Sequence, residues 1–125
     1  MTGAARAEST RELGEWGEQL ASRFLVSRGM QILDRNWRCE HGEIDLVALD
    51  GDCLVVCEVK TRRSTTFGDP VEAVTWRKAA RLRRLASAWL ADHELGCAGV
   101  RIDVIGIVRP GSGPAALRHL QGLGA

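Results

Sequence analysis

The sequence lacks the features that mark a membrane-spanning or an exported protein. It has no run of about 18 uncharged apolar residues, which a transmembrane helix would require. Residues 1–11 lack the charged stretch, the apolar run and the cleavage site of a secretory signal. None of the four cysteines forms a CxxC pair, and Cys53 and Cys57 are interpreted as small packing residues rather than zinc ligands. We therefore expect a cytoplasmic protein with reduced cysteines and no membrane partner.

Length and composition indicate one globular domain. The chain has 125 residues, 45% of them hydrophobic and 26% charged, which excludes the disordered and collagen-like classes. We expect a flexible segment over residues 1–9, a single domain over 10–121 and a tail over 122–125. The formal charge of +1 hides an asymmetry, because residues 60–91 carry eight Lys or Arg and only two Asp or Glu. A basic part beside an acidic part suggests a surface for a polyanion next to a carboxylate-rich site.

Turn residues and hydrophobic periodicity predict an α/β sandwich. A capping box begins a helix over about residues 10–28, and Asp69 followed by Pro70 begins a second helix that ends near residue 91. Short apolar segments predict five strands, at residues 30–38, 42–49, 53–61, 100–108 and 117–120. The second helix would connect the third strand to a parallel fourth strand. We therefore expect a mixed central sheet flanked by helices.

A two-residue turn signal at residues 50–51 predicts how the second and third strands pair. With these residues as the loop, Asp45 lies opposite Val56 and Glu43 lies opposite Glu58. Alternation then places an apolar set on the core face: Ile44, Leu46, Ala48, Cys53, Val55, Cys57 and Val59. The opposite face carries a charged set at the end away from the turn: Glu43, Asp45, Glu58 and Lys60.

Three carboxylates and one lysine therefore converge from two strands. Diagonal neighbours such as Asp45 and Glu58 lie roughly 7 to 8 Å apart at Cα, within reach of one shared cation. Few hard oxygen ligands suit Mg²⁺ or Mn²⁺ better than zinc. Lys60 could hold an attacking water or stabilise charge on a phosphoryl group. The alternative is a partly exposed ladder in which Glu58 and Lys60 pair with each other or with Glu43.

These residues resemble a known superfamily. Gly42-Glu43-Ile44-Asp45-Leu46 followed by Glu58-Val59-Lys60 resembles the PD-(D/E)XK nuclease signature, with Ile44 where the signature has proline. The chain is also similar to the small bacterial YraN family in four further segments: Gly14-x-x-Gly17-Glu18-x-x-Ala21, Ile32-Leu33-x-Arg35-Asn36-Trp37-Arg38, Phe67-Gly68-Asp69-Pro70 and Arg101-Ile102-Asp103-Val104. The similarity covers about residues 10–108 in order.

The resemblance implies a restriction-endonuclease-like three-layer sandwich, close to archaeal Holliday-junction resolvases. It also implies a metal-dependent phosphodiesterase activity, without indicating a substrate. Carried over residue by residue, Asp45 and Glu58 would bind Mg²⁺ or Mn²⁺, and Lys60 would assist the attacking water.

Further acidic residues have both a functional and a structural interpretation. Glu18 matches the acidic helix position that supplements the metal site in resolvase-like members, and a solvated helix residue is its alternative. Glu43 and Asp103 are candidates for supporting the metal ligands. The alternatives are structural pairs, Glu43 with Arg38 and Asp103 with a nearby arginine. His41, alone in a turn, is interpreted as a surface residue.

The second predicted helix carries a basic stripe. Six basic residues are candidates for contacts with phosphates: Arg62, Arg63, Arg77, Lys78, Arg81 and Arg84. Such contacts position a nucleic acid without reading its sequence. An ordinary solvated helix face is the alternative, and Trp76 and Trp89 are interpreted as packing residues.

Together these patterns predict a divalent-metal-dependent endonuclease that hydrolyses phosphodiester bonds in DNA in preference to RNA, with branched DNA among its candidate substrates. A symmetric homodimer would let so small a chain cut both strands. The first alternative is a nucleic-acid-binding module that keeps the nuclease fold without cutting. The second is a protein-interaction adaptor, for which charge reversal on the basic helix would leave nucleic-acid affinity unchanged.

Overall fold

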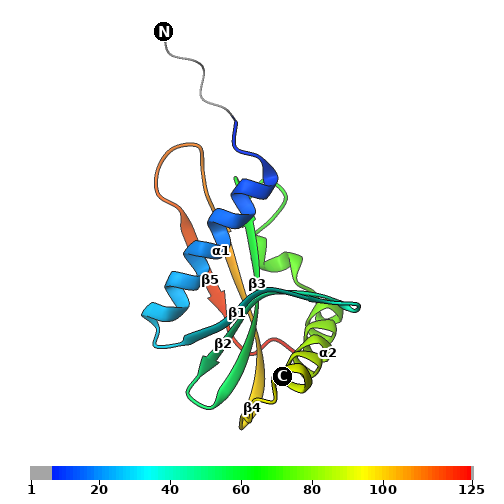
Figure 1. Ribbon diagram of the computed structural model, residues 1–125. Coiled ribbons are helices and arrows are strands. Elements are labelled where there is room, and N and C mark those ends of the chain that lie inside the picture. The colour runs from blue at the N-terminus through cyan, green and yellow to red at the C-terminus, as the bar shows by residue number, and fades with distance from the viewer. Residues whose placement is uncertain (1–6, 125) are drawn as a thin grey trace.

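The computed structural model describes residues 7–124 (Figure 1). Along the chain its elements are α1 Thr10–Ser27, β1 Gln31–Cys39, β2 Gly42–Asp50, β3 Cys53–Arg62, the 3₁₀ helix η1 Pro70–Ala73, α2 Trp76–His93, β4 Gly99–Val108 and β5 Ala116–Leu120. Residues 1–6 of the expected flexible segment and residue 125 of the expected tail lie outside the described residues. Within the described part, no helix is long and apolar enough to cross a membrane.

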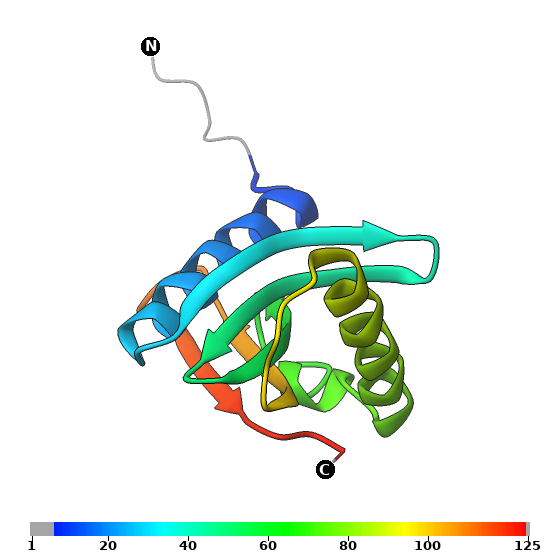
Figure 2. The ribbon, with the colours of Figure 1, turned by 60° about the horizontal axis from the view of Figure 1, so that its bottom comes forward.

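The strands form one mixed sheet with a helix on each face. Their order across the sheet is β1-β2-β3-β4-β5, with β3 and β4 parallel and the other neighbouring pairs antiparallel. The crossover through α2 supplies the long connection that parallel neighbours need. α1 covers one face of the sheet and α2 covers the other (Figure 2). The expected α/β three-layer sandwich is therefore confirmed, including the short last strand.

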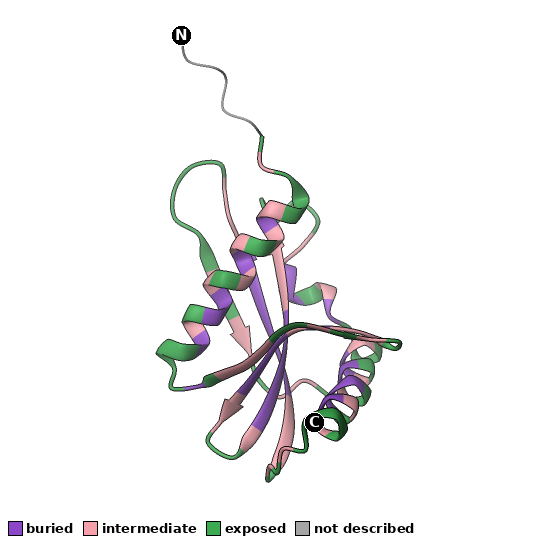
Figure 3. Cartoon of the chain, viewed as in Figure 1, coloured by how far each residue is buried: buried purple, intermediate pink, exposed green. Residues whose placement is uncertain are grey.

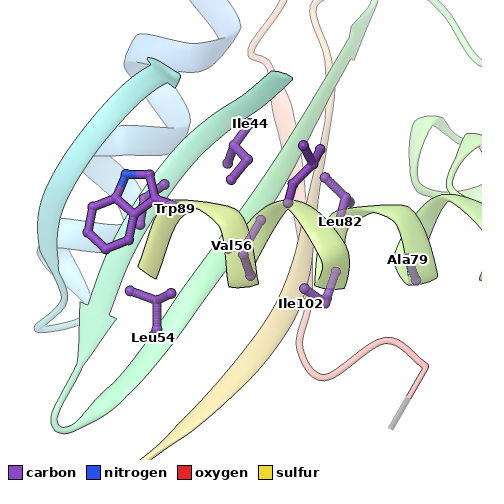
Figure 4. Close-up of a cluster of buried hydrophobic side chains, with 10 residues drawn as sticks. Ile44, Leu54, Val56, Ala79, Leu82, Trp89 and Ile102 are labelled. Atoms are coloured by element: carbon purple, nitrogen blue, oxygen red, sulfur yellow. The ribbon is translucent and has the colours of Figure 1, made fainter. Parts of the chain in front are cut away.

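The central strands β2, β3 and β4 are largely buried, whereas the edge strands β1 and β5 have only intermediate and exposed residues (Figure 3). Each helix packs an apolar side against one face of the sheet. The cluster under α1 includes Ala21, Leu25, Leu46, Ala48, Val55, Cys57 and Ile105. The cluster under α2 includes Ile44, Val47, Leu54, Val56, Leu82, Leu85, Trp89 and Ile102 (Figure 4). Trp89 is only 3% exposed, so its interpretation as a packing residue is confirmed.

The second helix begins later than the sequence predicts. Asp69 does cap a helical turn, because its side chain accepts a hydrogen bond from Val71 N–H at 3.1 Å. That turn is the short helix η1, which ends where Val74 is extended and packs with Val71 in a cluster against β4. Thr75 then caps α2, since its hydroxyl accepts a hydrogen bond from Lys78 N–H at 3.3 Å. Lys78 therefore lies in the first turn of α2.

The hairpin between β2 and β3 differs from the predicted pairing by two residues. Asp50 pairs with Cys53, so Gly51 and Asp52 form the turn. Only Gly51 has a positive φ, +62°, which suits a turn with glycine at its first central position. A shift by two residues preserves the faces of both strands, because side chains alternate with a period of two. If this register were continued beyond its last pair, Leu46 and Cys57, Asp45 would lie opposite Glu58 rather than Val56.

One residue of the predicted core face lies on the other side of the sheet. Ile44 packs in the cluster under α2, whereas Leu46 packs under α1. Alternation is therefore broken at Asp45, between them. In β1, the neighbouring Asn36 has a positive φ of +49°, which also departs from regular strand geometry. The irregularity places Asp45 at the point where strand pairing gives way to a cavity.

Two glycines of α1 provide a test of how closely this helix approaches the sheet. A methyl group on Gly17 would overlap Thr61 Oγ1 and lie 2.9 Å from Thr61 Cβ, whereas a methyl group on Gly14 would meet no atom within 4 Å. We expect Gly17→Ala to lower the free energy of unfolding by about 1 to 3 kcal/mol through overpacking. Gly14→Ala should raise it by about 0.5 to 1 kcal/mol through helix propensity. Urea unfolding measures both, and a Gly17→Ala variant as stable as the wild type would contradict this packing.

Candidate active site

The charged residues of β2 and β3 line one cavity beside the first turns of α2. The cavity has a volume of about 290 Å³ and is lined by Glu43, Asp45, Glu58, Val59, Lys60, Lys78, Arg81 and Leu82. Three carboxylates and three basic side chains therefore line the same cavity. The sequence predicted the convergence of the four charged strand residues, but it did not place the two basic residues of α2 among them.

Asp45 lies where β2 and β3 separate. The paired residues of the two strands end at Leu46 and Cys57. Beyond that pair, Val59 N–H donates a hydrogen bond to Asp45 Oδ2 at 2.9 Å. The Asp45 side chain therefore accepts the hydrogen bond that a main-chain carbonyl oxygen would accept in a regular sheet. Burial and the neighbouring Glu58 carboxylate raise the pKa of Asp45 to about 8. In the absence of a cation, Asp45 therefore holds a proton at neutral pH.

Glu58 is the second buried carboxylate of the cavity. It is 8% exposed, and its carboxyl group lies within hydrogen-bonding reach of Asp45. Lys78 Nζ, from α2, forms an ion pair with Glu58 Oε2. This ion pair supplies the opposite charge that a buried carboxylate requires.

Lys60 lies two residues along β3 from Glu58 and lines the same cavity. Within residues 7–124, the ion pairs of the cavity and its rim join Glu58 to Lys78 and Glu43 to Arg38. Neither pair involves Lys60, so its ammonium group is not neutralised by a carboxylate of the cavity. The alternative ladder, in which Glu58 and Lys60 pair with each other or with Glu43, is therefore not formed.

Asn36 connects the two acidic residues at the rim of the cavity. Its Nδ2 donates hydrogen bonds to Glu18 Oε1 at 2.9 Å and to Glu43 Oε1 at 3.3 Å. Glu43 Oε2 also lies 3.3 Å from Arg38 Nε, as the cross-strand alternative predicted. Glu18 does not line the carboxylate cavity, but it lines two other cavities, one of them together with Glu43, and its charge contributes to the raised pKa of Asp45. Asn36 was missed as a site residue, and its signal was an asparagine inside a strand, where that residue is disfavoured.

Asp103 belongs to a different cluster. It is fully buried, and Arg101 donates hydrogen bonds to both of its oxygens, from Nε at 2.9 Å and from Nη2 at 3.0 Å. His119 Nε2–H donates to Asp103 Oδ2 at 2.8 Å. Asp103 does not line the carboxylate cavity. The structure thus places it in the arginine pair that was the structural alternative for this residue.

The basic residues of α2 lie at and beside the cavity. Lys78 and Arg81 line it, and Arg81 also lines a neighbouring cavity together with Arg84. The Arg77 guanidinium lies 5.5 Å from the centre of the Trp76 ring. Trp76 is the first residue of α2 and is 73% exposed, so its interpretation as a packing residue is wrong.

The two arginines that follow β3 have partners elsewhere. Arg62 Nη1 donates a hydrogen bond to the Phe67 carbonyl oxygen at 3.1 Å. Arg63 Nη2 donates to the Glu8 carbonyl oxygen at 2.6 Å, and Arg63 Nη1 lies 3.3 Å from Glu8 Oε1. Neither arginine lines the carboxylate cavity.

The carboxylates of the cavity fit a small, hard cation. Within residues 7–124, no three side chains of His, Cys, Asp or Glu converge closely enough to form a complete metal site. Mg²⁺ is usually held by only one or two carboxylates, with water and phosphate oxygens in its other positions. Asp45 and Glu58 supply such a pair, and a cation would relieve the repulsion between them.

Cys57 is fully buried, and burial raises the pKa of its thiol well above the ordinary value, as fits a packing residue.

The raised pKa of Asp45 predicts a pH-dependent cost to stability in metal-free protein. An unfolded Asp titrates near 3.8 and folded Asp45 near 8, so folding is penalised progressively as the pH rises through this interval. We expect Asp45→Asn to raise the free energy of unfolding at pH 8 in EDTA by several kcal/mol, up to about 5, since each pH unit between the two values is worth about 1.4 kcal/mol, with little effect near pH 4. Urea unfolding across this pH range measures the difference.

Asp52→Asn is the matched control, because Asp52 is exposed in the turn between β2 and β3. Its stability should follow that of the wild type at every pH. If the free energy of unfolding depended on pH in the same way in the wild type and in Asp45→Asn, the carboxylates of Asp45 and Glu58 would not destabilise the folded protein by repulsion.

Comparisons with known proteins identify the family. The profile described as "Uncharacterised protein family UPF0102" matches residues 17–107. A UPF0102 protein from Nocardioides sp. is 56% identical over 124 residues, which is 99% of this chain and 100% of the relative. UPF0102 proteins from Arthrobacter sp. and Frankia casuarinae are 56% and 54% identical, over 90% and 88% of this chain and 95% and 93% of their own lengths. The chain therefore belongs to the UPF0102 family, also called the YraN family.

Proposed function

We propose that this protein is a divalent-metal-dependent endonuclease that hydrolyses phosphodiester bonds in DNA. The observation that carries the proposal is the buried carboxylate pair of Asp45 and Glu58, with Lys60 two residues along the same strand. Holding two acids together under burial costs stability, and such strained titratable groups concentrate at functional sites. The resemblance of these residues to the PD-(D/E)XK signature supports the same assignment.

Each charged residue of the cavity has a role in this proposal. Asp45 and Glu58 would hold Mg²⁺ or Mn²⁺, which when bound polarises a phosphoryl oxygen and lowers the pKa of a water molecule. Lys60 orients the attacking water and stabilises negative charge on the phosphoryl oxygens. The water oxygen forms a bond to phosphorus, the ester bond breaks, and a proton passes to the leaving oxygen. Lys78 balances the charge of Glu58.

The proposal includes the cytoplasmic location and the preference for DNA over RNA that the sequence led us to expect. Branched DNA is the substrate that we would test first, because the resemblance points toward Holliday-junction resolvases. A symmetric pair of copies would cut the two strands of a duplex.

Cleavage of labelled linear, flapped and four-way-junction DNA, and of matching RNA, tests the proposal. The purified protein should cut at least one of the DNA substrates in Mg²⁺ or Mn²⁺ and none of them in EDTA. Binding without cutting under every metal would instead favour a nucleic-acid-binding module that keeps the nuclease fold. Absence of both binding and cutting would reject both functions for these substrates.

A further inference from the structure

A second, cationic cavity adjoins the carboxylate cavity along α2. It has a volume of about 380 Å³ and is lined by His41, Arg81, Arg84 and Ala88. Arg81 lines both cavities, so the two are neighbours that share one side chain. In contrast to the first cavity, the second has no carboxylate in its lining.

The walls of this cationic cavity come from two separate parts of the chain. Arg81, Arg84 and Ala88 lie three and four residues apart on α2, and such spacings place side chains on one face of a helix. His41 lies in the turn that joins β1 to β2. Figure 2 shows this hairpin extending beside α2. The small side chain of Ala88 leaves space between the hairpin and the helix.

Gly42 allows the Arg81 guanidinium to lie against the main chain of β2. A methyl group on Gly42 would stand 3.1 Å from Arg81 Nη2 and 3.4 Å from Arg81 Nε, so a side chain there would press on the guanidinium. Gly42 also has a φ of +141°, which L-residues with side chains rarely adopt. This glycine opens the Gly42-Glu43-Ile44-Asp45 segment, and the structure gives it a physical role beside Arg81.

The two arginines of the cationic cavity keep their charge unneutralised. Among residues 7–124, no carboxylate lies within ion-pair distance of Arg81 or Arg84, whereas His41 Nε2 lies 3.4 Å from the exposed Glu40. Two guanidinium groups facing a hollow of this size form a site for an anion, and guanidinium geometry suits the paired oxygens of a phosphate.

We propose that this cationic cavity binds the phosphate adjacent to the scissile phosphate on the same nucleic-acid strand. Arg81 and Arg84 contact this phosphate from α2, and His41 contacts it from the opposite wall. The inference rests on the proposed function, because Asp45 and Glu58 define where the scissile phosphate lies. The nucleic-acid strand would then run from the carboxylate cavity past Arg81 and between the β1–β2 turn and α2.

Binding of a short labelled single-stranded DNA in EDTA, at several salt concentrations, tests this path without cleavage. The test variant is His41→Gln with Arg84→Gln, since neither residue lines the carboxylate cavity. We expect its affinity to fall by about tenfold or more. The slope of log affinity against log salt should become shallower by about 0.7 for each phosphate that the variant no longer neutralises.

Two further measurements separate this inference from the proposed function. Arg23→Gln removes a positive charge from an exposed position on α1 and should leave affinity within about twofold of the wild type. Binding of Mn²⁺ alone should be the same in the His41→Gln, Arg84→Gln variant as in the wild type. Unchanged DNA affinity and salt slope in that variant would overturn the inference while leaving the nuclease proposal standing. A wild type that binds no nucleic acid would overturn both.

Discussion

Replacing Asp45 with asparagine should lower the rate of Mg²⁺-dependent phosphodiester cleavage by about 10³-fold or more. The substitution removes one of the two carboxylates proposed to hold the cation, and metal assistance contributes several kcal/mol of transition-state stabilisation. The variant keeps an oxygen that can accept the hydrogen bond from Val59 N–H. Single-turnover cleavage at saturating DNA measures the loss.

Loss of activity through unfolding is distinguishable from loss of the ligand. Asp45→Asn should be more stable than the metal-free wild type at pH 8, because burial and Glu58 raise the pKa of Asp45. Asp52→Asn should cleave as the wild type does. Cleavage by Asp45→Asn within a few-fold of the wild type would contradict the assignment of Asp45.

Lys60→Met keeps most of the aliphatic stem and should slow cleavage by about 10² to 10³-fold while metal binding persists.

Asp103→Ala should lower the free energy of unfolding by about 3 to 5 kcal/mol, the largest loss of stability that we expect. Asp103 is fully buried and accepts hydrogen bonds from Arg101, His119 and the main-chain N–H of Gly122. Arg101 stays charged after Asp103 is removed, because a guanidinium is not deprotonated in proteins, and it then lacks the partner that accepts two of its hydrogen bonds. Urea or guanidinium unfolding measures the effect.

Glu15→Ala is the control for an exposed ion pair. Glu15 lies 3.0 Å from Arg11 Nε, and both side chains are mostly exposed. Its removal should change stability by less than about 0.5 kcal/mol. A cost below about 1 kcal/mol for Asp103→Ala would show that the buried cluster is not a major source of stability.

The sequence predicted the faces of the hairpin better than its pairing. The turn signal predicts Asp50 and Gly51 as the loop, whereas Gly51 and Asp52 form it. Because the error is two residues, Asp45 and Glu58 stay on one face and come closer than the predicted diagonal. The break in alternation at Asp45 carried no signal in hydrophobic periodicity, so Ile44 was assigned to the wrong side.

The contribution of α2 to the candidate site depended on where that helix begins. Asp69 and Pro70 are a genuine helix start, but they are used by η1, and Thr75 provides a second cap closer to the basic residues. Lys78 lies three residues after this second cap and pairs with Glu58. Between the two starts, Val74 is extended and packs with Val71 and Val104, a tertiary contact that a local sequence pattern does not contain.

Titration of Mn²⁺ into the wild type and Asp45→Asn by calorimetry at pH 7.5 tests the central claim most directly, because every step of the proposed chemistry requires a cation at Asp45 and Glu58. The account predicts that the wild type binds Mn²⁺ and releases a proton as it does so, since the cation replaces the proton held by Asp45. It predicts that Asp45→Asn, although folded, loses this binding. Equal Mn²⁺ binding by the two proteins, or none by the wild type, would contradict the account.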